Sequence, residues 1–386
     1  MKESRCSAGT ETIGCEAAMK NTFGNTITLT IFGESHGPAI GGVLDGLPPG
    51  LKIDEEDIRK MNDRRRPAGK TGTARREADR PEFLSGVKDG CSEGTPLAFI
   101  IRNTDVKRHD YDALTGIARP GHADYSAQMK YLGYQDASGG GHFSGRLTAV
   151  LTTAGAILMR ALEEKGILIG THISVLGGIE DQKLDTLDPA DQLRELRGKQ
   201  FAVLNEEAGE KMRMLIEQTA EQKDSVGGIL ETGIAGLPAG IGEPFFDSLE
   251  SMLAHVLFSI PAVKGVEFGS GFGFAEMKGS EASDPFALRN DRVVTLANHN
   301  GGVNGGISNG MPVILRTAYK PVSSIGKPQK TISFEKMEET EIEIQGRHDP
   351  AIVHRACAVQ DAVCALVIAD MLAVRYGTLW LKGGYE

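Results

Sequence analysis

The sequence has few cysteines and no long apolar run. Its five cysteines show neither metal-ligand nor redox spacing, and a chain of 386 residues buries enough core to need no disulfide bridges. We therefore expect a reducing, cytoplasmic location and no bound metal. No run approaches the roughly 18 apolar residues of a membrane span, and no apolar segment near the start resembles a secretory signal. The sequence therefore predicts a protein without a membrane partner.

The sequence also lacks the common nucleotide-binding glycine patterns, although glycine is abundant at 49 of 386 residues. There is no Gly-x-y period, which excludes collagen. Neither Gly139–Gly141 nor Gly301–Gly310 matches the dinucleotide fingerprint or the P-loop. The glycines are therefore expected in turns and in loops of the kind that often bind ligands.

Positive charge is concentrated in one segment of an acidic chain. The net charge is −10, whereas 59–80 holds nine Lys or Arg residues against three Asp or Glu residues. Such a run is usually a solvated face, but arginine forks also suit carboxylate and phosphate oxygens. An RNA-binding module would need aromatic residues for base stacking, and only Phe83 lies nearby. The pattern favours a small polyanionic ligand over a nucleic acid.

Three helices follow from apolar spacing and capping residues. Asp54 and the acidic residues after it predict a helix through about Arg65. Apolar residues at helical spacing predict a second helix over 147–162. The dipeptide Asp349-Pro350, with Asp349 as N-cap, predicts a long third helix that ends at Gly377.

The chain is expected to form one α+β domain over 19–386, because no linker or composition break divides it. The βαβ rhythm of a Rossmann fold is not evident. Residues 1–18 are small and polar without periodicity, which predicts a disordered N-terminal extension.

His36 lies between glycines just after a predicted strand, in Gly33-Glu34-Ser35-His36-Gly37. Histidine is the side chain best suited to move a proton near neutral pH. A surface turn is the alternative interpretation. The segment also has the letters of a nucleophile elbow, but that motif needs a strand-to-helix turn, and Pro38 follows here.

A second histidine, His122, lies in Arg119-Pro120-Gly121-His122-Ala123-Asp124-Tyr125. The segment combines an arginine suited to anions with a tight turn and a carboxylate. Asp124 could orient His122 or cap the following helix.

Three further segments offer groups that could bind an anion or move a proton. Gly139–Gly141 precedes a helix, where consecutive N–H groups can form an anion nest. The glycine loop 300–310 and the later Lys320–Ser324 supply backbone, a cation and hydroxyls. An ordinary connector is the alternative for each of these. Asp349 could have a catalytic role in addition to its capping role.

These motifs occur in one order along the chain, and together they resemble the chorismate synthase family from about Met19 to about Gly377. They are Gly-Glu-Ser-His-Gly at 33–37, Arg-Arg-Arg-Pro at 64–67, Arg-Pro-Gly-His-Ala-Asp-Tyr at 119–125, the triple glycine, Lys-Gly-Val-Glu-Phe-Gly at 264–269, Gly-Gly-Ile-Ser-Asn-Gly at 305–310 and Arg-His-Asp-Pro at 347–350. The resemblance implies a β-α-β sandwich with helices between antiparallel sheets, and a homotetramer.

The resemblance also implies a carbon–oxygen lyase of the shikimate pathway. The substrate would be 5-enolpyruvylshikimate 3-phosphate, which loses phosphate and a ring hydrogen by anti-1,4-elimination to give chorismate. The family needs reduced FMN. A bifunctional enzyme that also reduces FMN with NADPH is the alternative, and a separate flavin reductase would otherwise be a partner. Arg65 could then meet the 2′-phosphate of NADPH.

By motif position, the resemblance assigns four catalytic residues. His36 would donate a proton to the reduced flavin with support from Ser35. His122 would donate a proton towards the departing phosphate, and Asp349 would act as the base. Substrate anions or NADP would meet Arg65 and Arg119.

The resemblance assigns the FMN site to residues of four segments. These are His142, Phe143, Ser144, Gly305, Lys320, Pro321, Val322, Ser323, Ser324 and Arg347. The chain departs from the family where His142-Phe143 replaces the commoner Arg-Ser, which exchanges a cationic fork for a titratable ring. A shorter stretch after Pro67 also leaves a second basic contact at Lys70 uncertain.

Overall fold

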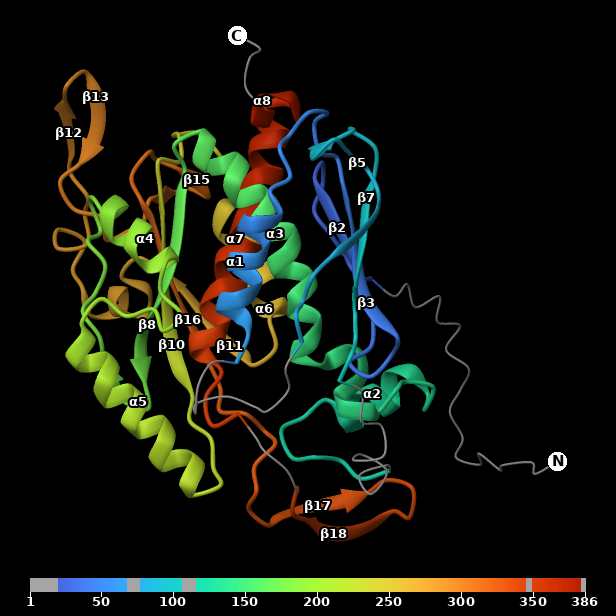
Figure 1. Ribbon diagram of the computed structural model, residues 1–386. Helices are drawn as coiled ribbons and strands as arrows, with labels where there is room; N and C mark the ends of the chain where they lie inside the picture. The colour runs from blue at the N-terminus through green and yellow to red at the C-terminus, as the bar shows by residue number, and fades with distance from the viewer. Residues whose placement is uncertain (1–19, 68–76, 106–115, 345–348, 383–386) are drawn as a thin grey trace, which may run out of the picture.

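Two five-stranded antiparallel sheets enclose a layer of helices in the computed structural model, which describes residues 20–67, 77–105, 116–344 and 349–382 (Figure 1). The first sheet has the order β1 (Thr22–Phe23), β2 (Thr28–Gly33), β3 (Ala39–Asp45), β7 (Leu97–Arg102) and β4 (Glu82–Ser85). The second has the order β11 (Val263–Phe268), β16 (Val313–Tyr319), β10 (Gly228–Ala235), β8 (Leu168–Leu176) and β9 (Ile179–Glu180). The expected sandwich of helices between antiparallel sheets is therefore present.

Three helices fill the space between the sheets: α1 (Glu55–Arg65), α3 (Thr148–Glu164) and α7 (Val353–Tyr376) (Figure 1). The other helices are α2 (Asp124–Tyr131), α4 (Ala190–Arg197), α5 (Glu206–Glu221), α6 (Leu249–Ser259) and α8 (Leu379–Lys382), with 3₁₀ turns η3 (Ser138–Phe143), η4 (Gly145–Leu147) and η5 (Gly271–Glu276). The remaining strands pair as β5 (Val87–Lys88) with β6 (Cys91–Ser92), β12 (Phe286–Arg289) with β13 (Arg292–Thr295), β14 (Val303–Asn304) with β15 (Ile307–Ser308) and β17 (Gln329–Ser333) with β18 (Glu338–Ile342).

The capping residues confirm the predicted start of one helix and correct the predicted start of another. Asp54 caps α1, since its carboxylate accepts a hydrogen bond of 3.0 Å from the Glu56 N–H. The third helix, α7, begins at Val353 after the N-cap Ile352, which makes no side-chain cap. The prediction that Asp349 caps this helix was wrong, because its carboxylate instead pairs with the Arg355 side chain.

Helix α7 is the centre of the core. By length and composition it could cross a membrane, but 94% of its 18-residue apolar window is buried inside the protein. This helix was predicted, but the expectation that no apolar run approaches the length of a membrane span overlooked its apolar stretch. A Cβ on Gly155 of α3 would overlap Ala362 of α7, so glycine allows the two helices to approach closely.

Candidate active site

The loop of residues 34–38 joins β2 to β3 and holds His36 inside the protein. His36 is 5% exposed and Ser35 is 1% exposed. The Ser35 N–H donates a hydrogen bond of 3.1 Å to the Gly141 carbonyl, which ties this loop to the triple glycine. Because the loop joins two strands, it does not have the strand-to-helix turn of a nucleophile elbow.

The triple glycine receives both candidate histidines. Gly139 has a φ of +62°, and a Cβ at this position would overlap the His36 ring. A Cβ on Gly140 would lie 3.3 Å from His122 Nε2. The two rings therefore pack against neighbouring glycines, in the position where the sequence suggested an anion nest.

His122 is oriented by Asp124. The His122 Nδ1 lies 2.6 Å from Asp124 Oδ1, and Asp124 also accepts two hydrogen bonds of 2.7 Å from the Arg119 guanidinium. Burial opposes the charge on Asp124, but hydrogen bonds from Arg119 and His122 outweigh burial and hold the pKa of its carboxyl well below the ordinary 3.8. The following helix has Ala123 as its N-cap with no side-chain cap, so Asp124 orients His122 and does not cap α2.

The segment Lys320–Ser324 follows β16 and reaches the loop that contains His122. The Ser323 hydroxyl donates to the Gly121 carbonyl at 2.8 Å, and the Lys320 ammonium donates to the same carbonyl and to Ser323 Oγ at 3.1 Å. The structure thus brings a cation and a hydroxyl from one candidate cofactor segment to Gly121, which precedes His122 in the chain. Pro321, Val322 and Ser324 belong to the same short segment.

His142, Phe143 and Ser144 make contacts within the protein. The His142 Nδ1 lies 2.9 Å from the Gly33 carbonyl, at the end of β2, and its Nε2 lies 3.2 Å from Asn21 Oδ1. The Phe143 ring packs against Tyr131 with its centroid 6.0 Å away. The Ser144 hydroxyl accepts a hydrogen bond of 3.2 Å from the Arg146 N–H, as the cap of η4.

Gly305 is separated from the other candidate cofactor residues within this chain. Gly305 lies in the turn between β14 and β15, which precedes the first residue of β16. Lys320, in contrast, directly follows the last residue of that strand. Seven residues of β16 at about 3.3 Å each place roughly 20 Å between the two strand ends. Arg347, Lys70 and the segment 1–18 lie outside the described residues, so the structure says nothing about them.

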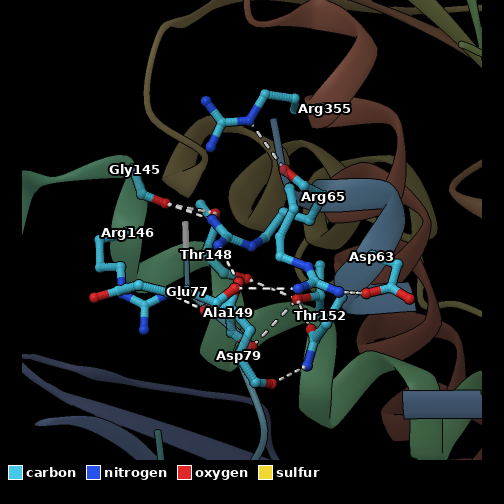
Figure 2. Close-up of polar contacts among 12 residues, drawn as sticks. Asp63, Arg65, Glu77, Asp79, Gly145, Arg146, Thr148, Ala149, Thr152 and Arg355 are labelled. Carbon is cyan, nitrogen blue, oxygen red and sulfur yellow. Dashed lines mark hydrogen bonds and ion pairs between the residues drawn. The ribbon is translucent and has the colours of Figure 1, made fainter. Parts of the chain in front are cut away.

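Arg64 and Arg65 of the basic run lie inside the protein and form ion pairs, whereas Arg59 and Arg80 are exposed. Figure 2 shows the contacts of Arg65. Arg65 is 4% exposed, and its Nη2 lies 2.7 Å from Asp79 Oδ2. The other Asp79 oxygen pairs with the Arg146 guanidinium. Burial lowers the pKa of Arg65 to about 10, and the two arginines outweigh burial to hold the pKa of Asp79 below its ordinary value. Neither a solvated face nor an exposed ligand patch describes Arg65.

Sequence reasoning missed the acidic partners and the asparagine that complete this network. Glu77 Oε2 lies 2.6 Å from Arg146 Nε, and the same Nε donates to Asn103 Oδ1 at 3.0 Å. Glu77 and Asp79 were visible only as acids within the basic run. Asn103 carried no signal, because its partners are distant in sequence.

Asp349 is joined to this network through Arg355. The Arg355 Nη1 pairs with the Asp349 carboxylate, and its Nε donates to the Arg65 carbonyl at 2.9 Å. A single residue, Arg355, therefore links the candidate base Asp349 to Arg65 of the buried network.

Comparisons with known proteins identify this arrangement. A family model described as chorismate synthase matches residues 27–373. The chorismate synthase of Pyrococcus abyssi is 46% identical over 352 residues, which cover 91% of this chain and 97% of the relative. That of Korarchaeum cryptofilum is 45% identical over 349 residues, which cover 90% of this chain and 96% of the relative. A crystal structure of chorismate synthase superposes with a TM-score of 0.71 at 28% identity, over 92% of this chain and 94% of that one.

The fold and these relatives define an enzyme of the lyase class. The chain belongs to the chorismate synthase family, as the ordered motifs indicated.

Proposed function

We propose that this protein converts 5-enolpyruvylshikimate 3-phosphate to chorismate by anti-1,4-elimination of phosphate, with reduced FMN as cofactor. The observation that best supports the proposal is the placement of His36 and His122 against Gly139 and Gly140, beside buried arginines. The substrate carries carboxylates and a phosphate, so its elimination needs both proton transfer and cationic groups.

His122 acts as the general acid in this proposal. Asp124 accepts a hydrogen bond from Nδ1 and so directs the exchangeable proton to Nε2, which donates towards the departing phosphate. Asp349 accepts the ring hydrogen as its carboxylate, which the ion pair with Arg355 stabilises. His36, supported by Ser35, is the second proton carrier. Arg119 supplies positive charge beside His122, although its guanidinium also pairs with Asp124. Arg65 is assigned to the substrate by the resemblance alone, because its guanidinium is buried against Asp79.

The described residues fit a phosphate-bearing flavin. Lys320 and Ser323 supply an ammonium and a hydroxyl at the Gly121 carbonyl, which are groups suited to phosphate oxygens. We therefore place the cofactor along Lys320–Ser324 and His142–Ser144, with Gly305 and Arg347 assigned by the resemblance alone. Reduced FMN, when bound, supplies the electron-rich ring that the family uses to assist loss of phosphate.

The activity is tested by anaerobic phosphate release from 5-enolpyruvylshikimate 3-phosphate with dithionite-reduced FMN. Phosphate and chorismate in equal amounts are expected, and no phosphate release from folded protein would contradict the proposal. A parallel reaction with NADPH and oxidised FMN tests the bifunctional alternative. No observation favours that alternative, since Arg65 is buried against Asp79. We expect the enzyme to depend on an external reductant, such as a flavin reductase.

We also propose a cytoplasmic homotetramer. The hairpin of β12 and β13 projects from the molecule (Figure 1) and exposes Phe286, Leu288 and Val293 at 67%, 79% and 61%. Exposed apolar residues grouped on one hairpin are typical of an interface between subunits. Light scattering should give the mass of four chains, and a monomer would contradict the proposed tetramer.

The cysteines agree with the proposed cytoplasmic location. The described cysteines Cys91, Cys357 and Cys364 are free thiols, as expected in a reducing compartment.

A further inference from the structure

Asn103 holds both ends of the loop segment that contains His36. It follows the last residue of β7, and its Nδ2 donates to the Glu34 carbonyl at 3.0 Å and to the Gly37 carbonyl at 2.8 Å. Its backbone N–H donates to the Pro38 carbonyl at 3.2 Å. A single residue from a neighbouring strand thus fixes three carbonyls of the connection between β2 and β3.

The orientation of the Asn103 amide is set by its partners. Its Oδ1 accepts a hydrogen bond of 3.0 Å from Arg146 Nε, and an arginine can only donate. The two loop carbonyls can only accept, so the NH₂ group must face them. Arg146 is itself held by Glu77 at 2.6 Å and by Asp79. The Asn103 amide therefore connects the buried ion pairs of Arg146 to the backbone of the loop.

We propose that Asn103 is a positioning residue for His36: it fixes the loop backbone so that the buried imidazole stays against Gly139 in the geometry needed for proton transfer. The proposal rests on the proposed function of His36. The loop needs such a restraint because glycines flank it at Gly33 and Gly37, and glycine leaves the backbone free to move. A displacement of about 1 Å at a reacting group can reduce the rate about 100-fold.

Asn103→Asp is the sharpest single change. The carboxylate has the shape of the amide and still accepts from Arg146, but it donates to neither Glu34 nor Gly37. Asn103→Ser is the second variant, in case the aspartate prevents folding. Asn298→Asp is a matched control, because the Asn298 amide likewise donates to two carbonyls, those of Thr186 at 2.8 Å and Pro312 at 2.9 Å.

Two measurements on the full-length enzyme test the proposal. Hydrogen–deuterium exchange of the peptide spanning 33–38 should be faster in the Asn103 variants and unchanged in Asn298→Asp. The kcat for phosphate release should fall about 10- to 100-fold in the Asn103 variants, with KM changed less than about twofold because substrate contacts are kept. In a His36→Ala background, the Asn103 substitution should cost nothing further, since the residue it positions is absent.

The outcomes separate the two proposals. Unchanged exchange at 33–38, unchanged kcat, or equal losses in the wild-type and His36→Ala backgrounds would each overturn the role of Asn103. Wild-type kcat in His36→Ala alone would instead overturn the catalytic role of His36. The exchange measurement would then still decide whether Asn103 holds the loop.

Discussion

His36 and His122 pack against adjacent glycines of one short segment, although they come from a strand connection and from the loop before α2. A Cβ on Gly139 would overlap the ring of His36, and a Cβ on Gly140 would lie 3.3 Å from Nε2 of His122. The absence of side chains at these two positions is what allows the two imidazoles to share one site. Glycine at position 139 therefore leaves room for the His36 ring and also allows the backbone φ of +62°.

Gly139→Ala should abolish most turnover while the protein stays folded. The new Cβ must displace the buried His36 ring, and the positive φ adds strain of about 1–2 kcal/mol. The measurement is kcat for phosphate release, with circular dichroism to confirm folding. Gly145→Ala is the matched control in the same region, because its Cβ would meet nothing within 4 Å and its φ is not positive. Equal activity of the two variants would contradict the assigned position of His36.

Asp124→Asn should lower kcat more than it raises KM. The amide is a weaker acceptor than the carboxylate and its NH₂ group would face the Arg119 donors, so the His122 ring loses the partner that orients it through Nδ1. General acid–base groups contribute about 10²- to 10⁴-fold, and we expect a loss of at least tenfold. The measurement is kcat and KM for phosphate release. A kcat identical to the wild type would leave Asp124 with only its ion pair to Arg119.

The His172 cluster should make folding stability depend on pH. Its Nδ1 lies 2.9 Å from Asp181 and its Nε2 lies 3.0 Å from Glu231, all three side chains being buried. Burial opposes the charge, but these hydrogen bonds outweigh it and raise the pKa of His172 above the ordinary 6.5. The stabilisation is therefore complete below about pH 6.5 and is lost as the pH rises through the higher folded-state pKa.

This pH dependence is measured by urea unfolding of the wild type and of His172→Gln over a series of pH values. The difference in unfolding free energy between them should shrink as the pH rises. A difference that grows with pH would show that His172 is neutral in the folded protein.

Asp79→Asn should destabilise the protein by about 3–5 kcal/mol, because it leaves Arg65 and Arg146 as buried charges without their shared partner. Urea unfolding measures the loss. Glu82→Gln is the control, since it breaks the exposed pair with Arg102 and should cost about 1 kcal/mol or less. Equal effects of the two substitutions would mean that the buried network does not stabilise the fold.

Local sequence patterns predicted the helices but not every residue at which they begin. The capping role of Asp54 and the spacing of apolar residues in α3 are local, and both predictions are confirmed. Asp349 has the same local signal as Asp54, yet α7 begins later because Arg355 binds the carboxylate. A capping pattern shows where a helix can begin, and tertiary contacts decide where it does.

The candidate site was predictable only as a set of segments. Spacing alone left His36, His122 and the glycines as separate loops, and the family resemblance was needed to group them. Contacts such as Asn103 with the His36 loop join residues that no sequence pattern relates. Gly305 lies at the opposite end of β16 from Lys320, so its assignment to the cofactor site rests on the resemblance alone.

The most direct test is anaerobic single-turnover phosphate release by His36→Ala, His122→Ala and Asp349→Asn, each compared with the wild type at saturating reduced FMN and substrate. We predict that all three bind FMN and remain folded, but release phosphate at least about 100-fold more slowly, as expected for proton-transfer residues. Wild-type rates in all three variants would contradict the assignment of this site to the elimination.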